Sequence, residues 1–264
     1  MKKTLSILFF LVLFICAYPE DTLRIMTFNI DYGQDTTLKA LGEFIKQYDP
    51  DIVALQEVDV MTRRKNSPKT HNRNLITELA FYTQMLPVFG KAINHPTGGF
   101  YGDAILTKYD IKSVETYTLP RSDKKIEERQ MVVATLNAKG HDIAFASTHL
   151  SFENPQNRKM QLKRLNSIMR QYKYRKKLRF ICGDLNSDTS EKLVLPILKG
   201  FQDAFDPDDG TFSANTQSET YKQFKYDYIL FSSPKNDTKV INYIIDCIRS
   251  YSDHCICIAD IVIK

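Results

Sequence analysis

The sequence predicts a single α/β domain in which two β-sheets stack face to face and helices cover their outer surfaces. Its 264 residues are 43% hydrophobic and 25% charged, an ordinary globular composition that can bury one large core. Strand-like runs dominate both halves of the chain, and amphipathic helices lie between them. Because no repeat, low-complexity tract or linker interrupts residues 22–264, we expect them to form one such layered domain.

Residues 1–17 are predicted to be a secretory signal peptide. Two lysines precede an apolar stretch, residues 5–15, that is too short to span a membrane comfortably. Cleavage after Ala17 is one outcome. The alternative is that Cys16 is the lipid-accepting cysteine of a bacterial lipoprotein, although Ile15 stands where a small residue is preferred. In both cases we expect an exported bacterial protein that is periplasmic, secreted or attached to the outer envelope.

The beginning of the domain has the pattern of a strand–helix–strand unit. Residues 23–30 alternate as a strand, and residues 36–48 place apolar side chains at helical spacing. Pro50 ends that helix, because proline disfavours a helical residue before it. The apolar run at residues 52–58 predicts a buried strand.

The middle of the chain turns from a loop to strands. Residues 61–74 are polar and basic and predict a loop, followed by a short helix at about residues 74–80. Gly98-Gly99 and Lys139-Gly140 stand where hairpin turns would be. The expected strands are residues 84–93, 103–107, 113–119, 131–137 and 143–148.

The remainder of the chain mixes helices and strands. Residues 157–172 are expected to form a second amphipathic helix, and residues 191–198 a short one that Pro196 limits. Residues 207–223 are expected to form a polar loop. The expected strands are residues 178–181, 226–232, 240–248 and 255–263.

Four cysteines fall in the strand-like runs of the domain. None belongs to a CxxC pair, so a structural zinc site is not expected. We expect small buried hydrophobic side chains at Cys182, Cys247, Cys255 and Cys257 rather than a disulfide framework. A single bridge from Cys247 to Cys255 or Cys257 is the alternative in an oxidising compartment.

Six short motifs place acidic, amide or imidazole side chains at the ends of apolar strand-like runs, which normally exclude charge. Each motif alone has a plain explanation, such as a polar strand cap, a tight turn or a surface histidine. Because all six stand at strand ends, we expect them to gather into one pocket. Their residues are Asn29 and Asp31 in TFNID, Glu57 in LQE, His149 in THL, Asp184 and Asn186 in GDLN, Asp227 in YDY, and Asp253 and His254 in SDH.

These residue types suit the hydrolysis of a phosphate ester with the help of a hard metal ion. Mg²⁺ prefers oxygen ligands and is held by one or two carboxylates. Glu57 ends an apolar strand, where a carboxylate is unfavourable unless it is paired or bound to metal. The strand–helix–strand unit makes its two strand ends neighbours, so Asn29, Asp31 and Glu57 are expected to meet. Asp253 would add a further carboxylate.

The remaining motifs supply candidate catalytic groups. Asp184 is a candidate to hold the attacking water, Asn186 to donate to a phosphate oxygen, and His149 to be a second donor. His254 is the best candidate for an imidazole that faces the phosphate, oriented by the carboxylate of Asp227.

Over residues 23–264 the chain resembles the endonuclease/exonuclease/phosphatase superfamily, which has the DNase I-like fold. Beyond the six motifs, the resemblance includes RRK and the short helix after LQEVD, FYGDAILTK, Leu119-Pro120 and EERQMVVATL. It implies a four-layer α/β sandwich and a phosphoesterase that depends on Mg²⁺ or Mn²⁺. By position, it implies metal binding at Asp31, Glu57 and Asp253, phosphate binding at Asn29, Arg129 and Asn186, and catalysis at His149, Asp184, Asn186, Asp227 and His254.

Two further positions carry open alternatives. Arg129, in the EER motif, would contact the phosphate, and its alternative is a surface salt bridge with Glu127 or Glu128. Asp103 stands where chains of the family often carry Asn. An acid there would add negative charge near the phosphate, alter metal number or substrate preference, or face away from the site.

The sequence does not fix the substrate. A net charge of +5 suits a ligand that carries phosphate, but many proteins share it. The basic loop at residues 63–73 is expected to rim the pocket, and it suits DNA, a lipid headgroup or a small phosphodiester equally. We expect phosphodiesters rather than monoesters, with sphingomyelin, other phospholipids or inositol phosphates as alternatives. A catalytically inactive binding module is the second class, and without an evident protein partner we expect a monomer.

Overall fold

Two mixed β-sheets face each other in the part of the chain that the computed structural model describes, residues 21–206, 212–216, 225–235 and 237–264. The first sheet has the order β10 (Phe212–Thr216), β12 (Thr238–Cys247), β13 (Ile256–Ile263), β1 (Thr22–Asn29), β2 (Ile52–Val60), β4 (Phe100–Thr107) and β3 (Leu86–Asn94). The second has the order β5 (Ile111–Thr118), β6 (Gln130–Ala138), β7 (His141–His149), β8 (Leu178–Asp184), β11 (Asp227–Ser232) and β9 (Gln202–Asp203).

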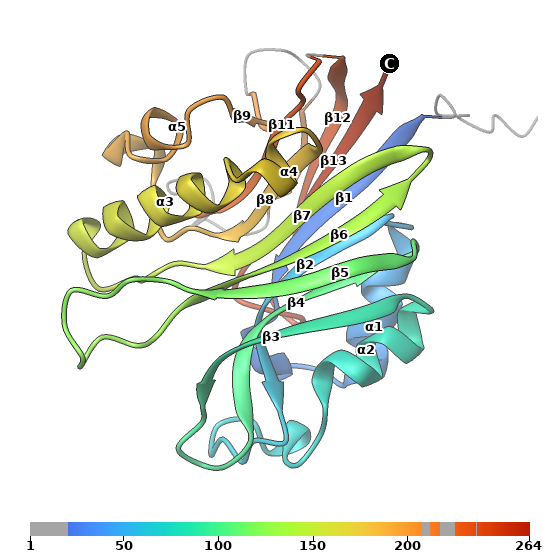
Figure 1. Ribbon diagram of the computed structural model, residues 1–264. Helices are drawn as coiled ribbons and strands as arrows, with labels where there is room; N and C mark the ends of the chain where they lie inside the picture. Colours follow the sequence, from blue (N-terminus) through green and yellow to red (C-terminus); the bar gives the residue numbers. More distant parts are fainter. Residues whose placement is uncertain (1–20, 207–211, 217–224, 236) are drawn as a thin grey trace, which may run out of the picture.

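Helices cover the outer face of each sheet, which gives the four predicted layers (Figure 1). Helices α1 (Leu38–Gln47) and α2 (Leu75–Thr83) pack on the first sheet. Helices α3 (Pro155–Met169), α4 (Tyr172–Arg175) and α5 (Val194–Ile197) pack on the second. Short 3₁₀ helices complete the elements: η1 (Asp31–Gly33), η2 (Pro68–Thr70) and η3 (Thr189–Glu191). Among the described residues, no helix is both long and apolar enough to cross a bilayer.

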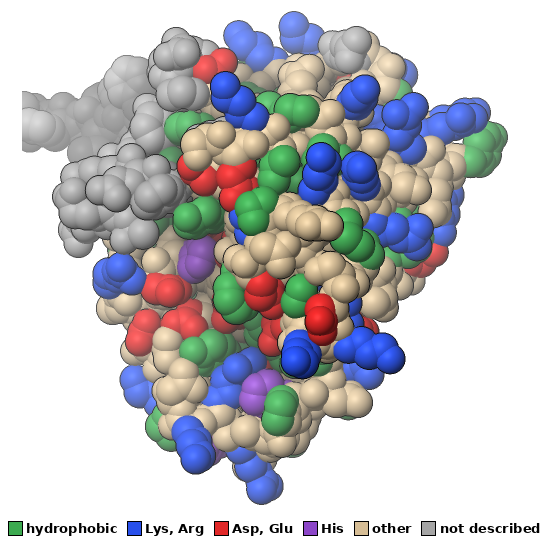
Figure 2. All heavy atoms as spheres, turned by 90° about the vertical axis from the view of Figure 1, so that its left-hand side faces the viewer, with side chains coloured by type: hydrophobic (Ala, Val, Ile, Leu, Met, Phe, Trp, Pro, Cys, Tyr) green, Lys and Arg blue, Asp and Glu red, His purple; other side chains and the backbone are tan. Residues whose placement is uncertain are grey.

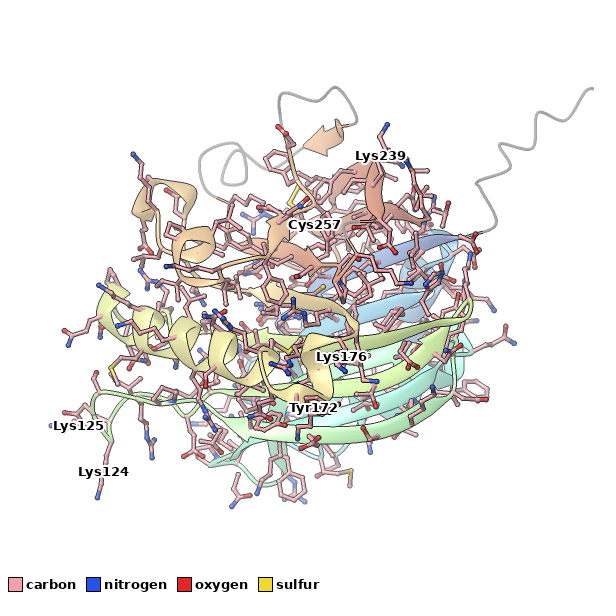
Figure 3. The ribbon with its side chains drawn as sticks, turned by 45° about the horizontal axis from the view of Figure 1, so that its top comes forward. Lys124, Lys125, Tyr172, Lys176, Lys239 and Cys257 are labelled. Atoms are coloured by element: carbon pink, nitrogen blue, oxygen red, sulfur yellow. A yellow bond between two sulfur atoms is a disulfide. The ribbon has the colours of Figure 1, made fainter. Side chains whose placement is uncertain are left out.

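The main core lies between the two sheets. Side chains from both inner faces fill this space, and Cys257 of β13 is one of them (Figure 3). Strands β1 and β2 are buried on both faces, which explains why their sequences read as nearly continuous apolar runs rather than as clean alternation. The side chains of β1 that point outward pack against α1 and α2 instead.

Local signals in the sequence set the helix starts. The side chain of Thr37 accepts a hydrogen bond from the Ala40 amide at the start of α1, and Asn74 caps α2 in the same way. Asn154 caps α3, with Pro155 in the first turn where its missing N–H has no consequence. These caps place α2 and α3 directly after the two loops that border the site.

Several boundaries differ from the prediction. The second amphipathic helix divides into α3 and α4, and the short helix expected at residues 191–198 is only the four residues of α5 next to η3. The loop expected at residues 207–223 contains strand β10, and the other residues of that segment lie outside the described residues. The predicted signal peptide, with Cys16, also lies outside them.

A disulfide joins Cys247 to Cys255 across the end of the β12–β13 hairpin. The preferred expectation of four small buried hydrophobic side chains was therefore wrong for these two, and the alternative of a single bridge from Cys247 is confirmed. Cys182 and Cys257 are buried in the core, as expected. The bridge closes the loop that carries the SDH motif.

Candidate active site

Parallel strand pairs bring the motifs together. β1 pairs in parallel with β2 in the first sheet, and β7 pairs in parallel with β8 in the second. The carboxyl ends of both pairs lie at the same end of the sandwich, so Asn29, Glu57, His149 and Asp184 meet there. Figure 2 views this end and shows Asp, Glu and His side chains gathered on it, with Lys and Arg side chains around them.

A polar cavity of about 340 Å³ opens at this end of the sandwich. Motif residues from both sheets line it, together with residues from three loops. The lining residues are Glu57, Arg64, Tyr101, Glu127, Arg129, His149, Phe152, Asp184, Asn186 and His254.

The Asp184 carboxylate is the hub of the site. Its Oδ2 lies 3.3 Å from Asn29 Nδ2, 3.4 Å from His149 Nε2 and 3.6 Å from His254 Nε2. Its Oδ1 accepts the backbone N–H of Asn186 at 2.9 Å. Burial raises the pKa of Asp184 to about 6, although the neighbouring His254 opposes the shift. The carboxylate is thus mostly ionised near pH 7, and it lines the cavity.

Asp227 and His254 form the predicted pair. Asp227 stands opposite Asp184 in the antiparallel β8–β11 register, and its Oδ2 lies 2.9 Å from His254 Nδ1. Burial alone would lower the pKa of His254, but the Asp227 and Asp184 carboxylates hold it well above its ordinary value. The Ser252 hydroxyl donates to the carbonyl of Asn29 at 2.7 Å, which anchors the SDH loop to the end of β1.

His149 is held in the neutral form. Burial lowers its pKa well below the ordinary value, and the nearby Arg129 and His254 lower it further. Arg129 Nη1 lies 2.9 Å from His149 Nδ1. Because a guanidinium can only donate, Nδ1 accepts from Arg129 and the proton of the neutral ring is on Nε2, which lies 3.4 Å from the acceptor Asp184 Oδ2. Arg129 is buried, lines the cavity and pairs with Glu127 at 3.3 Å, so the salt bridge is present and the phosphate contact stays a prediction.

Glu57 occupies a β-bulge in β2. The register with β4 shifts between Leu55 and Val58, and Glu57 has a positive φ of 58°, a conformation that is strained for a residue other than glycine. The bulge turns its carboxylate into the cavity, where Oε1 accepts from Asn29 Nδ2 at 3.0 Å. Burial, together with the charges of Asp31 and Asp184, raises the pKa of Glu57 to about 7.

The donor set fits a hard divalent cation. Burial and the neighbouring Asp253 raise the pKa of Asp31, whose carboxylate accepts a hydrogen bond from the Gln34 side chain. Asp31, Glu57 and Asp253 would supply the carboxylate oxygens that a hard divalent cation prefers as ligands. One ligand atom each of Asp184, Asp227 and His254 also lies within 4.8 Å of the others. Asp31 and Asp253 do not line the cavity, so metal binding at Asp31, Glu57 and Asp253 stays a prediction.

Asp103 lies outside the cavity lining. It is buried, and its Oδ2 accepts from Gln130 Nε2 at 2.9 Å. Burial raises the pKa of Asp103 well above its usual value, although the nearby Arg129 opposes the shift. Of the alternatives considered for this position, the structure supports an acid that faces away from the substrate.

Four cavity or support residues were not assigned from the sequence. Arg64, Tyr101 and Phe152 line the cavity. Gln56 lies below it, fully buried, and its Nε2 donates to Ser147 Oγ at 3.2 Å across the space between the sheets. Gln56 could have been found from the sequence, because it is a polar residue within an apolar run. Arg64 shares its loop with four other basic residues, and pattern alone does not single it out.

The sequence model of the Endonuclease/Exonuclease/phosphatase family matches residues 26–254. The chain belongs to this family. The match covers β1 through the SDH motif, and therefore every residue assigned to the site. Membership supports a hydrolase of phosphate esters, and divalent-metal dependence is general in the family.

Solved structures of the family share the fold at low identity. The endonuclease/exonuclease/phosphatase from Beutenbergia cavernae superposes with a TM-score of 0.72 at 17% identity, covering 92% of this chain and 72% of that one. The corresponding Bacteroides vulgatus protein gives 0.71 at 18% identity, covering 92% and 99%. The human Nocturnin catalytic domain with a bound sulfate anion gives 0.66 at 22% identity, covering 92% and 94%. No curated protein sequence matches the chain.

Proposed function

We propose that this family member hydrolyses phosphodiester bonds, by attack of a water molecule that Asp184 activates, with Mg²⁺ or Mn²⁺ as cofactor. The observation that carries the proposal is the arrangement around Asp184 Oδ2, with one amide and two imidazole nitrogens within 3.6 Å, in the lining of the polar cavity. A phosphate placed above this carboxylate would meet donors from both sheets.

The protonation states suit this reaction near neutral pH. Asp184, with a pKa of about 6, is ionised and can accept a proton from water, while His254 is protonated and can donate to the phosphate or to the leaving oxygen. Neutral His149, Asn186, Asn29 and Arg129 would donate hydrogen bonds to the non-bridging oxygens. Proton acceptor and proton donor thus face one cavity.

Asp31, Glu57 and Asp253 are the residues that we propose to hold the metal. When bound, a divalent cation supplies charge neutralisation and polarisation of the phosphate. It would also offset the burial and the mutual repulsion that raise the pKa of Glu57 and of Asp31.

The test is hydrolysis of bis-p-nitrophenyl phosphate against p-nitrophenyl phosphate by the mature protein, with Mg²⁺, Mn²⁺ or EDTA. Metal-dependent cleavage that favours the diester is the expected result, and DNA, RNA, sphingomyelin and inositol phosphates would then identify the natural ester. Cleavage of neither ester, together with metal binding that Glu57→Gln abolishes, would favour the inactive binding module instead.

We further propose that the protein acts outside the cytoplasm as a monomer. The Cys247–Cys255 disulfide supports export, because such bonds persist in oxidising compartments. The signal-peptide pattern supports the same location, and lipidation of Cys16 is tested by the mass of the N-terminal peptide of the mature protein.

A further inference from the structure

Arg64 is fixed in the loop that follows β2. Its Nε lies 2.6 Å from Asp59 Oδ2 and its Nη2 lies 3.1 Å from Asp59 Oδ1, which is a bidentate pair. The Asp59 side chain is fully buried and also accepts from Thr62 Oγ1 at 2.6 Å. The Arg64 side chain is 19% exposed, so the pair joins a buried anion to a guanidinium at the surface of the cavity.

Two tyrosine rings hold the same guanidinium. Arg64 Cζ lies 4.4 Å from the ring centroid of Tyr32 and 4.8 Å from that of Tyr101. The Tyr32 hydroxyl is in turn fixed by Asn66 Nδ2 at 2.7 Å. A side chain that is usually mobile is therefore held in one orientation before any ligand binds.

One edge of this guanidinium is left to a ligand. Nε and Nη2 are used by Asp59, and the described residues provide no acceptor for Nη1. Arg64 and Glu57 both line the cavity, and the Glu57 carboxylate contributes to raising the pKa of Arg64. Tyr101 lies near both Arg64 and Arg129. A preoriented Nη1 in a cavity built for an anion has phosphate as its natural acceptor.

We propose that Arg64 binds a non-bridging phosphate oxygen of the substrate through Nη1, as a second guanidinium beside Arg129. This role rests on the proposed phosphoesterase function. Arg64 thus has two roles. Its Nε and Nη2 bond the Asp59 carboxylate, and its Nη1 binds the substrate. A lysine would supply the charge without that division of donors.

The first arm of the test compares Arg64→Gln with Arg63→Gln. Arg63 is the matched control, because it is the adjacent arginine of the same loop but is exposed and donates to Asn72. For bis-p-nitrophenyl phosphate we expect Arg64→Gln to raise KM about 10- to 100-fold, the effect of one charged hydrogen bond, with kcat changed less than about threefold. The inhibition constant of inorganic phosphate should rise by a similar factor. Arg64→Lys should recover only part of the loss, and Arg63→Gln should change neither constant more than about twofold.

The second arm separates substrate binding from a purely structural role. Arg64→Gln leaves Asp59 as a buried, uncompensated charge, so it is expected to lower stability as well. The double variant Asp59→Asn/Arg64→Gln removes both charges and should regain a thermal unfolding temperature close to that of the wild type. If KM stays raised in the double variant, Arg64 contacts the substrate. If KM returns to the wild-type value, Arg64 only balances Asp59 and the inference is wrong.

The two proposals fail in different ways. If the wild type hydrolyses the diester and Arg64→Gln leaves both KM and phosphate inhibition unchanged, the role of Arg64 is wrong and the phosphoesterase proposal stands. If the wild type hydrolyses nothing, calorimetric titration of inorganic phosphate with Mg²⁺ decides the role of Arg64. Binding that is lost in Asp59→Asn/Arg64→Gln but kept in Arg63→Gln supports it, and binding that is equal in all three proteins, or absent from the wild type, overturns it.

Discussion

Asp227 Oδ2 lies 2.9 Å from Nδ1 of His254, and the other nitrogen of that imidazole, Nε2, lies 3.6 Å from Asp184 Oδ2. The ring is thus held between two carboxylates that come from opposite positions of the β8–β11 register. Asp227 fixes the orientation of the imidazole and keeps it protonated, while Asp184 is left on the cavity side. A protonated histidine and an ionised aspartate can therefore act on the same phosphate.

The first prediction concerns this pair. Asp227→Asn should lower kcat about 100-fold, because the amide orients the imidazole but no longer stabilises its charge. It should also move the alkaline limb of the kcat–pH profile to lower pH, since the Asp227 carboxylate raises the pKa of His254. Steady-state kinetics between pH 5 and pH 10 measure both effects. Asp142→Asn is the control, because Asp142 is exposed and lies near the start of β7, at the opposite end of the strand from His149. An alkaline limb that stays in place would contradict the assigned role of Asp227.

The second prediction concerns the stability of the metal-free protein. The pKa of Glu57 is about 7 when folded and near 4.5 when unfolded, so the folded state binds more protons between these values. Stability should therefore fall as pH rises from about 4.5 to about 7. Glu57→Gln removes this penalty and should raise the free energy of unfolding at pH 8, in EDTA, by about 2 kcal/mol, with little change at pH 4.5. Urea unfolding at the two pH values tests this, and equal effects at both would contradict it.

The third prediction concerns metal binding at the same residue. Adding Mn²⁺ at pH 8 should raise the unfolding temperature of the wild type, because the ion binds only the folded protein. The shift should be small at pH 5, where Glu57 is protonated, and absent in Glu57→Gln. Thermal unfolding with and without EDTA measures it. A full metal-induced shift in Glu57→Gln would place the metal elsewhere, for instance at the Asp184, Asp227 and His254 group.

The fourth prediction concerns Gly183, which precedes Asp184. Its φ is +143°, and a Cβ at this position would lie 1.9 Å from the carbonyl oxygen of Thr148. Gly183→Ala should therefore lower the free energy of unfolding by roughly 3 kcal/mol and displace Asp184. Gly140→Ala is the control, because Gly140 also has a positive φ but nothing lies within 4 Å of its added Cβ, so a loss of about 1 kcal/mol is expected. Similar losses in the two variants would contradict the packing argument.

The fifth prediction concerns the disulfide. The bridge spans eight positions of sequence and closes the loop that ends in His254. Cys247→Ser/Cys255→Ser should lose roughly 2–3 kcal/mol of stability by loop entropy, and kcat should fall several-fold because the imidazole is less well fixed. Reduction of the wild type should reproduce both changes, and reoxidation should reverse them. Full activity after reduction would show that the Ser252 contact to β1 holds the loop alone.

The strand-end motifs could be predicted because charge in an apolar run is rare. Asn29, His149 and Asp184 each end a buried strand and Glu57 lies at a bulge within one, and parallel pairing of those strands brings them together. The sequence pattern does not predict the backbone conformation that orients these side chains toward the cavity. The positive φ of Glu57 arises from a bulge against β4, which no residue type in β2 signals.

Other features depend on long-range pairing. Cys247 joins Cys255 rather than Cys257 because the β12–β13 register sets Asp246 opposite Ile256, and sequence spacing does not fix that register. Likewise, Arg64 differs from Arg63 only because Asp59 and two tyrosine rings, from separate segments, meet its guanidinium. β10 was missed because a short strand in a polar segment has no apolar alternation to reveal it.

The most direct test of the account is the turnover of bis-p-nitrophenyl phosphate by Asp184→Asn and His254→Ala, each saturated with Mn²⁺ and each shown to be folded by its thermal unfolding curve. Removing the group that activates water, or its cationic partner, should lower kcat at least about 1,000-fold in either variant. Turnover at the wild-type rate in both folded variants would show that the hub at Asp184 is not the catalytic centre.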